Sequence, residues 1–425
     1  MSTPQPSTLR PVLAELPARP LNQQPKPAVS QTPSAEASSS CATRALTPPP
    51  TPPKLLHIET FTSTDGIETR HLAGSKNRKD QSAWDASTKV SRSGLQFYTK
   101  SYRLYNKLGH GVWSNVYLAF EVSEPSTPDL SQLSPPVSPT DNLGGLTSTT
   151  LESPVSRTSR MLAVKKPGRR DAAKVLEREA KMLTSLHLDE EASKYIVFFH
   201  GFDDAQKSIV LDAVPMTLDA YSRTARSCPP STQTMLDPII GAELWMTLAD
   251  HLIGGLQFLH GKGCIHGDIK PMNVLLRIDQ DQTITPLYCD FSSSRDATTT
   301  SAEKAEEISA VTADYTSPEL LAALQSRERG RAVATFASDI FGLAVTLLFA
   351  AIAESPYACG KLNLQRLGMA KEGMPIEYAR RSEQASRIMK GYAVDRVLQG
   401  ALTKDPRDRW SIQDWGKIMQ TVLKS

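Results

Sequence analysis

The sequence predicts an α+β fold of two lobes, in which a small strand-rich half precedes a larger helical half. Strand-like apolar runs around a glycine loop begin near Leu104 and recur up to Leu211. From Ala242 onward, leucines recur at spacings of three and four, as they do on one face of a helix. A polar, proline-rich segment precedes both halves. We therefore expect one folded domain at residues 96–425 and a disordered tail at residues 1–95.

The composition is that of a globular enzyme. Of the 425 residues, 40% are hydrophobic and 22% are charged, and the formal net charge is only +3. So small a charge gives no reason to expect a nucleic acid or a membrane surface as partner. The five cysteines are odd in number and form no C-x-x-C pair. Free thiols in a reducing compartment are expected, which favours a cytoplasmic or nuclear location.

No segment of the sequence is predicted to cross a membrane. The longest apolar run, Ile340–Ala353, has 14 residues. A bilayer-spanning helix needs about 18–20 residues, so this run predicts a buried core helix. The N-terminus has no apolar stretch typical of a signal peptide.

The first 95 residues are predicted to be disordered. Thirteen of the 30 prolines come before Leu55, and the apolar residues there show no period. Such a segment cannot bury enough surface to offset its chain entropy. The run Pro48–Lys54 favours polyproline II and contains P-x-x-P-x-K, a motif for a proline-motif-binding partner. A solvated tail without such a partner is the alternative, and we favour it.

A second disordered segment is predicted at residues 122–160, as an insert within a strand pair. It is rich in serine, threonine, proline and glycine and carries four Ser/Thr-Pro dipeptides. These dipeptides are either targets of proline-directed kinases or plain linker composition. After the insert we expect strands at Met161–Lys166, Ile196–Phe199 and Ile209–Leu211, and a helix at Asp171–Leu186.

The first candidate for chemistry is the glycine loop at residues 108–116. It reads G-x-G-x-x-S-x-V, and Gly109 and Gly111 let a backbone close over phosphates without a Cβ clash. Alone, the pattern fits a plain hairpin turn equally well. Lys165 then ends a predicted strand, and Glu179 on the next predicted helix is a candidate to hold it. Lys166 and Glu177 are alternatives for these two roles.

The most specific pattern is H-G-D-x-K-x-x-N at residues 266–273. Phosphoryl transfer needs a carboxylate for the attacking hydroxyl, a cation near the transferred group and an oxygen ligand for magnesium. Asp268, Lys270 and Asn273 supply these three groups. Asp290 leaves an apolar strand about one hairpin later, where a second metal contact is expected.

Together these motifs resemble, in order, those of the eukaryotic protein kinase family. Ser317-Pro318-Glu319 is similar to its A-P-E motif, and the resemblance implies an ion pair between Glu319 and Arg409. It implies a protein kinase-like fold and phosphorylation of protein substrates with bound ATP and Mg²⁺. Asn273 and Asp290 would hold the metal. The implied nucleotide-binding residues are Leu108, Gly109, Gly111, Val116, Ala163, Lys165, Glu179, Leu211, Asp212, Val214 and Asp290.

Two details resemble the serine/threonine branch of the family. Lys270-Pro271 stands where tyrosine kinases usually carry other residues, and Thr312 precedes the A-P-E-like motif at the spacing typical of this branch. Other positions depart from the family pattern. Gly267 replaces the arginine of H-R-D, which puts control by one activation-segment phosphate in doubt, and Ser292 replaces the glycine of D-F-G.

Two other functions remain open. His266-Gly267-Asp268 also fits small-molecule kinases of the aminoglycoside or choline type, although Lys270 and Thr312 do not. A catalytically weak pseudokinase scaffold would explain Gly267 and Ser292. Against it, the six polar positions of the site are all present: Lys165, Glu179, Asp268, Lys270, Asn273 and Asp290.

Overall fold

The computed structural model describes residues 69–70, 94–122, 160–228, 233–297, 312–325 and 332–424. The predictions for the tail, for most of the insert and for its Ser/Thr-Pro dipeptides lie outside these residues. Among the helices in this part of the chain, none combines the length and apolar character needed to cross a membrane.

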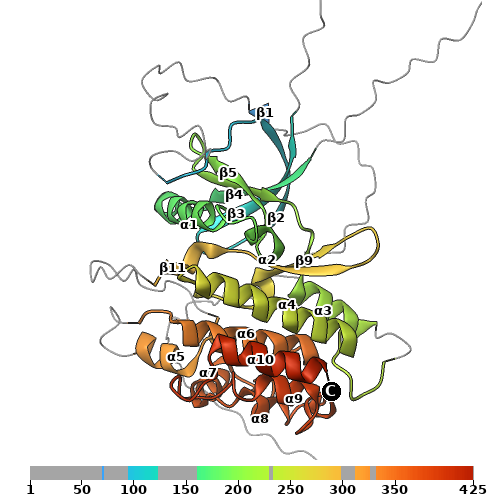
Figure 1. The fold of residues 1–425 in the computed structure, drawn as a ribbon. Helices are drawn as coiled ribbons and strands as arrows, with labels where there is room; N and C mark the ends of the chain where they lie inside the picture. The colour runs from blue at the N-terminus through green and yellow to red at the C-terminus, as the bar shows by residue number, and fades with distance from the viewer. Residues whose placement is uncertain are drawn as a thin grey trace, which may run out of the picture. The chain divides into compact units, whose positions relative to one another are not determined.

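A six-stranded antiparallel sheet builds the small lobe, in the order β1-β2-β3-β4-β6-β5 (Figure 1). Helix α1 packs against β4, β5 and β6, and α2 follows it. The bounds are β1 Thr69–Arg70, β2 Tyr102–His110, β3 Ser114–Glu121, β4 Met161–Pro167, α1 Ala172–Leu186, α2 Ala192–Tyr195, β5 Phe199–Asp203 and β6 Ser208–Asp212.

The strands around the insert lie where the sequence predicts them. β3 and β4 pair antiparallel, with Phe120 opposite Met161, and the amide of Glu121 donates to the carbonyl of Arg160 at 3.0 Å. The two ends of the insert therefore lie side by side, as expected for an insertion into a strand pair. The helix prediction for Asp171–Leu186 is also confirmed, with Asp171 at the N-cap of α1.

The strand predicted at Ile196–Phe199 is wrong in its position. β5 begins only at Phe199, and Ile196 makes an isolated bridge to Tyr288. Ile196 and Val197 are apolar because they are buried against the helical lobe, not because they lie in the sheet. A short apolar run does not distinguish these two environments.

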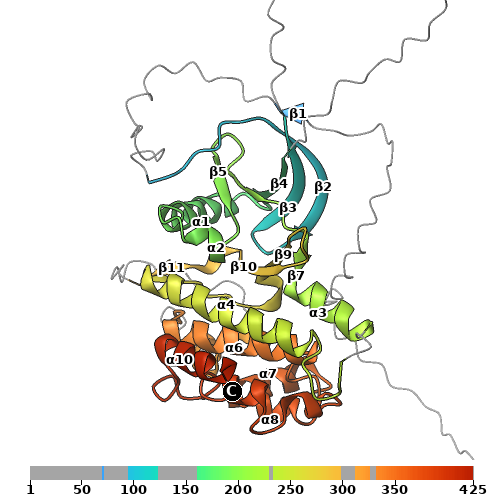
Figure 2. The same ribbon diagram turned by 45° about the vertical axis from the view of Figure 1, so that its right-hand side comes forward.

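The larger lobe contains helices and three short strand pairs (Figure 2). Its α-helices are α3 Leu218–Ser227, α4 Ala242–Gly261, α5 Pro318–Gln325, α6 Phe336–Ile352, α7 Asn363–Glu372, α8 Pro375–Ala379, α9 Ala393–Leu398 and α10 Ile412–Leu423. Its strands are β7 Met216–Thr217, β8 Cys264–Ile265, β9 Val274–Ile278, β10 Ile284–Tyr288 and β11 Arg295–Asp296.

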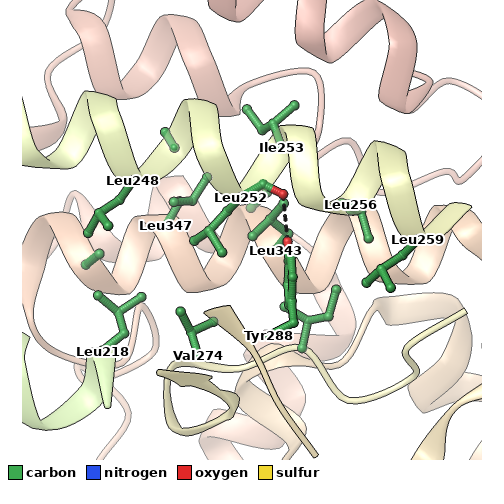
Figure 3. Packing of buried hydrophobic residues seen from close by; sticks show 14 of the residues in the cluster. Leu218, Leu248, Leu252, Ile253, Leu256, Leu259, Val274, Tyr288, Leu343 and Leu347 are labelled. Atoms are coloured by element: carbon green, nitrogen blue, oxygen red, sulfur yellow. Dashed lines mark hydrogen bonds between the residues drawn. The ribbon is translucent and has the colours of Figure 1, made fainter. Parts of the chain in front are cut away.

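Helices α4 and α6 form the centre of this lobe. The leucine face predicted for α4 is buried from Leu248 to Leu259, and it packs with α6 and Tyr288 (Figure 3). The Tyr288 hydroxyl donates to the carbonyl of Leu252 at 2.8 Å. The apolar run that begins at Ile340 lies in α6, which is buried from Ser338 to Ile352. It is a core helix, as predicted. Each such leucine contributes about 1.5–3 kcal/mol through its burial.

The β9–β10 hairpin brings two site residues together. Val274 at the start of β9 lies opposite Tyr288 at the end of β10. One residue beyond this pair, the amide of Cys289 donates to the carbonyl of Asn273 at 3.0 Å. The hairpin therefore places Asn273 and Asp290 at the same end of the ladder.

Candidate active site

The site begins with Lys165 on β4. Its ammonium group donates to both carboxylate oxygens of Glu179 at 2.8 Å and to Oδ1 of Asp290 at 2.6 Å. The Lys165 side chain is 5% exposed and that of Glu179 is 1% exposed, whereas that of Asp290 is 37% exposed. One ammonium group thus lies between two carboxyl groups, and with all three side chains ionised the cluster carries one negative charge in excess. We call these three residues the lysine cluster.

The alternatives for these roles lie elsewhere. Glu177 forms a surface ion pair with Lys181 at 2.9 Å, one helical turn away. Lys166 follows Lys165 on a strand, so its side chain points to the opposite face of the sheet. It forms no ion pair with a described residue. The structure therefore brings together Lys165 and Glu179.

The backbone at Asp290 is held in an uncommon conformation. Its φ of 62° lies in the left-handed region, which costs free energy for a residue other than glycine. The Phe291 amide donates to Oε1 of Glu179 at 3.1 Å, and the buried Phe291 ring lies 4.8 Å from the ring of His266. These contacts fix Asp290 so that Oδ1 faces Lys165. Its Oδ2 makes no hydrogen bond to any residue that the structure describes.

Charge and burial set the protonation of the lysine cluster. Burial by itself lowers the pKa of Lys165, but the carboxylates of Asp290 and Glu179 outweigh it, and this pKa lies above its usual value. Burial opposes ionisation of Asp290, yet Lys165 holds the pKa of Asp290 below its usual value. Burial raises the pKa of Glu179, with Lys165 opposing the rise. The ammonium of Lys165 and the carboxylate of Asp290 are therefore both charged at neutral pH.

The loop after β8 carries a second group of polar residues: Asp268, Lys270 and Asn273. The Lys270 ammonium donates to Oδ2 of Asp268 at 2.6 Å, and Nδ2 of Asn273 donates to the same oxygen at 3.1 Å and to the Asp268 carbonyl at 2.8 Å. Within the described residues, Oδ1 of Asp268 and Oδ1 of Asn273 have no hydrogen-bond partner. Lys270 also donates to the Thr312 hydroxyl at 3.4 Å. The loop therefore leaves one carboxylate oxygen and one amide oxygen open.

Burial raises the pKa of Asp268 above its usual value, while the Lys270 ammonium opposes the rise. A carboxylate with a raised pKa binds a proton more readily and is a better general base. Asp290 contributes to the raised pKa of Asp268 through its negative charge. Hydrogen bonds connect the two groups: Asn273 donates to Asp268, and the Asn273 carbonyl accepts from the amide of Cys289, the residue before Asp290. The lysine cluster and the loop therefore form one site.

Asp339 of α6 anchors this loop, a role that no motif in the sequence assigns to it. Its carboxylate accepts hydrogen bonds from the amide of His266 at 2.7 Å and from the amide of Gly267 at 2.9 Å. It is 2% exposed and lies 3.3 Å from Nε2 of His260. An acidic residue inside an otherwise apolar helix is the sequence signal that could have indicated such an anchor.

Gly267 is required by its surroundings. Its φ is +80°, and a Cβ here would lie 2.6 Å from the carbonyl oxygen of Ser293. Any larger side chain would strain the loop that carries Asp268. The missing arginine of H-R-D is therefore accompanied by a backbone that favours glycine. Ser292 lies within a 3-10 turn, Phe291–Ser293, where its amide donates to Oδ1 of Asp290 at 3.4 Å.

The glycine loop is the turn between β2 and β3. Gly109 lies opposite Val116, and the Gly111 amide donates to the Ser114 carbonyl at 2.7 Å. A Cβ at Gly109 would meet no described atom within 4 Å, and one at Gly111 would meet only Ser114, at 4.0 Å. Neither glycine has a positive φ. Protein packing therefore does not require glycine at either position.

Apolar residues of the sheet lie near Lys165, and Val116 of β3 is opposite it in the strand pair. Ala163 lies opposite Leu211 in the sheet, both are buried, and Val116 and Val214 are half-buried beside the main core. Leu108 is 37% exposed. The Asp212 carboxylate lies 2.6 Å from Nε2 of His200. In the described part of the chain, neither the amide nor the carbonyl of Val214 forms a hydrogen bond.

The predicted ion pair between Glu319 and Arg409 is confirmed. Arg409 donates to the two oxygens of Glu319 at 2.9 and 3.1 Å. It also donates to the carbonyls of Ala337, Thr403 and Lys404. All five guanidinium donors are therefore used.

A family comparison matches most of the helical lobe and part of the small lobe. The model of the protein kinase domain matches residues 143–421, more than half of the chain. The glycine loop and β3 precede the matched region, and β3 pairs with β4, which lies within it.

Several curated proteins are similar to parts of this chain. A probable serine/threonine-protein kinase, PkwA of Thermomonospora curvata, is 33% identical over 38% of this chain and 20% of its own length. Human 3-phosphoinositide-dependent protein kinase 1 is 40% identical over 16% of this chain and 12% of its own length. Serine/threonine-protein kinase ISR1 of Eremothecium gossypii is 26% identical over 59% of this chain and 67% of its own length. The chain thus covers about a fifth of the bacterial relative.

Proposed function

Because this chain belongs to the protein kinase domain family, we propose that it transfers the γ-phosphoryl group of ATP to serine or threonine hydroxyls of proteins. One observation carries the proposal. Two lysines and three carboxylates, from segments up to 125 residues apart, meet in one site that keeps open oxygens.

The open oxygens fit a magnesium ion. Oδ2 of Asp290 and Oδ1 of Asn273 are hard oxygen donors of the kind that Mg²⁺ prefers. The excess negative charge of the lysine cluster would also be balanced by a divalent cation. When bound, Mg²⁺ would neutralise charge on the phosphates of ATP. Asp290 and Asn273 would hold it, and Lys165 would bind the α- and β-phosphates while Glu179 keeps it in place.

The nucleotide would lie against the small lobe. Gly109 and Gly111 have no packing role, so their lack of a Cβ favours close approach of the loop to phosphates. The apolar residues Leu108, Val116, Ala163 and Leu211 would contact the adenine. The free amide and carbonyl of Val214, in the connection after Asp212, would form its hydrogen bonds.

Asp268 and Lys270 would act on the acceptor. The substrate oxygen attacks the γ-phosphorus, the bond from that phosphorus to the β,γ-bridging oxygen breaks, and the hydroxyl proton passes to Oδ1 of Asp268. The raised pKa of Asp268 suits it to accept this proton. Lys270 would offset charge on the transferred group. Its contact with Thr312 supports the serine/threonine branch.

We also propose the domain limits 96–425 and a cytoplasmic or nuclear location. Leu95 is already buried, which supports an ordered domain from about this point. The four cysteines in the described residues, at positions 228, 264, 289 and 359, are free thiols. This agrees with a reducing compartment.

Transfer of labelled phosphate from Mg·ATP tests the proposal. The purified protein would be incubated with a serine, threonine and tyrosine peptide library, with Asp268→Asn as the inactive control. We expect label on serine and threonine peptides. Label on amino alcohols instead of peptides would indicate a small-molecule kinase. No transfer with retained ATP binding would indicate a pseudokinase scaffold, the alternative that Gly267 and Ser292 leave open.

A further inference from the structure

A short segment before β2 lies along the free edge of the sheet, beside β5. We call residues Gly94–Tyr98 the strap. Phe97 bridges Phe202 of β5 in parallel, the Phe202 amide donates to the Gln96 carbonyl at 2.9 Å, and the Tyr98 amide donates to the Phe202 carbonyl at 3.0 Å. β5 is the last strand of the sheet, and in Figures 1 and 2 the blue segment before β2 passes beside it. The strap therefore covers this edge.

The strap is anchored on both faces of the sheet. Leu95 is 4% exposed and belongs to the main core, together with Leu183 of α1. Tyr98 is 7% exposed and belongs to a separate apolar cluster with Leu162 and Val210. Leu162 and Val210 alternate along their strands with residues of the main core, so the two clusters lie on opposite faces. The strap thus wraps around the edge of the sheet.

A chain of hydrogen bonds connects the strap to α1. The Gln96 amide donates to the Thr184 hydroxyl at 3.1 Å, and this hydroxyl donates to the Ala180 carbonyl at 2.8 Å. Thr184 is 2% exposed, so the contact is shielded from water. Ala180 follows Glu179 directly. The side-chain amide of Gln96 also donates to the carbonyl of His200, next to Gly201.

Gly201 shows how closely the strap approaches β5. Its φ is +144°, and a Cβ there would lie 2.6 Å from the Tyr98 nitrogen and 2.7 Å from the Phe97 carbonyl carbon. Backbone atoms cannot move aside as a flexible side chain can. The packed position of the strap therefore requires glycine at residue 201.

We propose that the strap is a positioning element that holds α1 in place, so that Glu179 remains in contact with Lys165. The positioning residues are Leu95 of the strap and Thr184 of α1, and neither is one of the site residues. If the strap is released, α1 loses a buried hydrogen bond on its C-terminal half, and Leu95 leaves the core into which α1 packs. The catalytic consequence rests on the proposed function, whereas the hold on α1 does not.

Hydrogen exchange in the full chain tests the hold on α1. Leu95→Ala and Thr184→Val should each raise amide exchange in α1 by about fivefold or more and leave α10 unchanged. Leu95→Met keeps most of the buried volume and should restore protection. Lys100→Ala is the matched control, because Lys100 follows the strap, has a 61% exposed side chain and pairs with Glu121 on β3. Unchanged exchange in α1 for both variants would overturn the proposal.

A double-mutant cycle tests the route through Glu179. Leu95→Ala should lower kcat/KM roughly tenfold in the parent but cause little further loss in Glu179→Gln. A general structural defect would lower kcat/KM equally in both backgrounds, and that result would overturn the positioning role. If the parent transfers no phosphate at all, the proposed function fails, and the exchange experiment still decides whether the strap holds α1.

Discussion

Two ion pairs with buried cations, one in each lobe, differ in a way that separates a structural contact from a functional one. Arg409 and Glu319 balance each other, and every donor of the guanidinium is used. Lys165 instead faces two carboxylates, and one of them, Asp290, is 37% exposed with an oxygen left open. The first arrangement is complete without a ligand. The second, with all three side chains ionised, keeps an excess negative charge that a bound cation would balance.

The largest effect is expected from a change of Asp268, the carboxylate next to the lysine cluster. Asp268→Asn should lower kcat by about 10²–10⁴, because the amide cannot accept the hydroxyl proton. ATP affinity should stay close to that of the parent, since Lys165, Asn273 and Asp290 remain. Steady-state phosphorylation and nucleotide titration measure the two quantities. Asp279→Asn, an exposed carboxylate on the β9–β10 hairpin, is the control. A variant as fast as the parent would show that Asp268 is not the base.

The comparison itself is tested by removing one carboxylate from each ion pair. Glu319→Gln leaves Arg409 buried without a counter-charge and should lower the free energy of unfolding by about 3–5 kcal/mol. Glu179→Gln leaves Lys165 paired with Asp290. It should therefore lower activity, but lower the free energy of unfolding less than Glu319→Gln does. Chemical denaturation followed by fluorescence measures both variants.

Glu377→Gln is the control for this pair of variants. Its side chain is 59% exposed, and its partner Arg380 keeps Asp395, so we expect a change below about 1 kcal/mol. If Glu179→Gln destabilised the protein as much as Glu319→Gln, the distinction between the two ion pairs would be lost.

The catalytic loop could be predicted from the sequence because its chemistry lies within eight consecutive residues. The contact between Lys165 and Asp290 could be predicted only through the resemblance, since the two residues are 125 positions apart. The misplaced β5 shows that apolar content alone does not separate a strand from a buried connection. The strap was missed because backbone hydrogen bonds to an edge strand leave almost no mark on residue type. Gly201 was its only local signal.

A smaller effect is expected at the glycine loop. Gly109→Ala should raise the KM for ATP about three- to tenfold, because the added methyl group would meet the phosphates and not the protein. Stability should hardly change. Gly368→Ala is the matched control, since a Cβ there also meets nothing within 4 Å but lies on α7, away from the site. If Gly109→Ala left KM unchanged, the loop would not approach the nucleotide.

The smallest effect concerns pH. The fall of kcat/KM at low pH, its acid limb, should report protonation of Asp268. Burial raises the pKa of Asp268, and the Lys270 ammonium opposes the rise. Removing the ammonium in Lys270→Gln should raise this pKa further, so the residual activity should be lost at a higher pH, by about one unit or less. Lys194→Gln, on the exposed surface of α2, should leave the limb in place. A limb that moves to lower pH in Lys270→Gln would contradict the assignment.

Calorimetric titration with ATP, in the presence and absence of Mg²⁺, tests the central claim most directly. If the excess charge of the lysine cluster is balanced by a divalent cation on the nucleotide, Mg²⁺ should tighten ATP binding by about tenfold or more in the parent. The same ion should have little effect in Asp290→Asn. Binding that is equally tight with and without Mg²⁺, or no heat of ATP binding under either condition, would contradict the account.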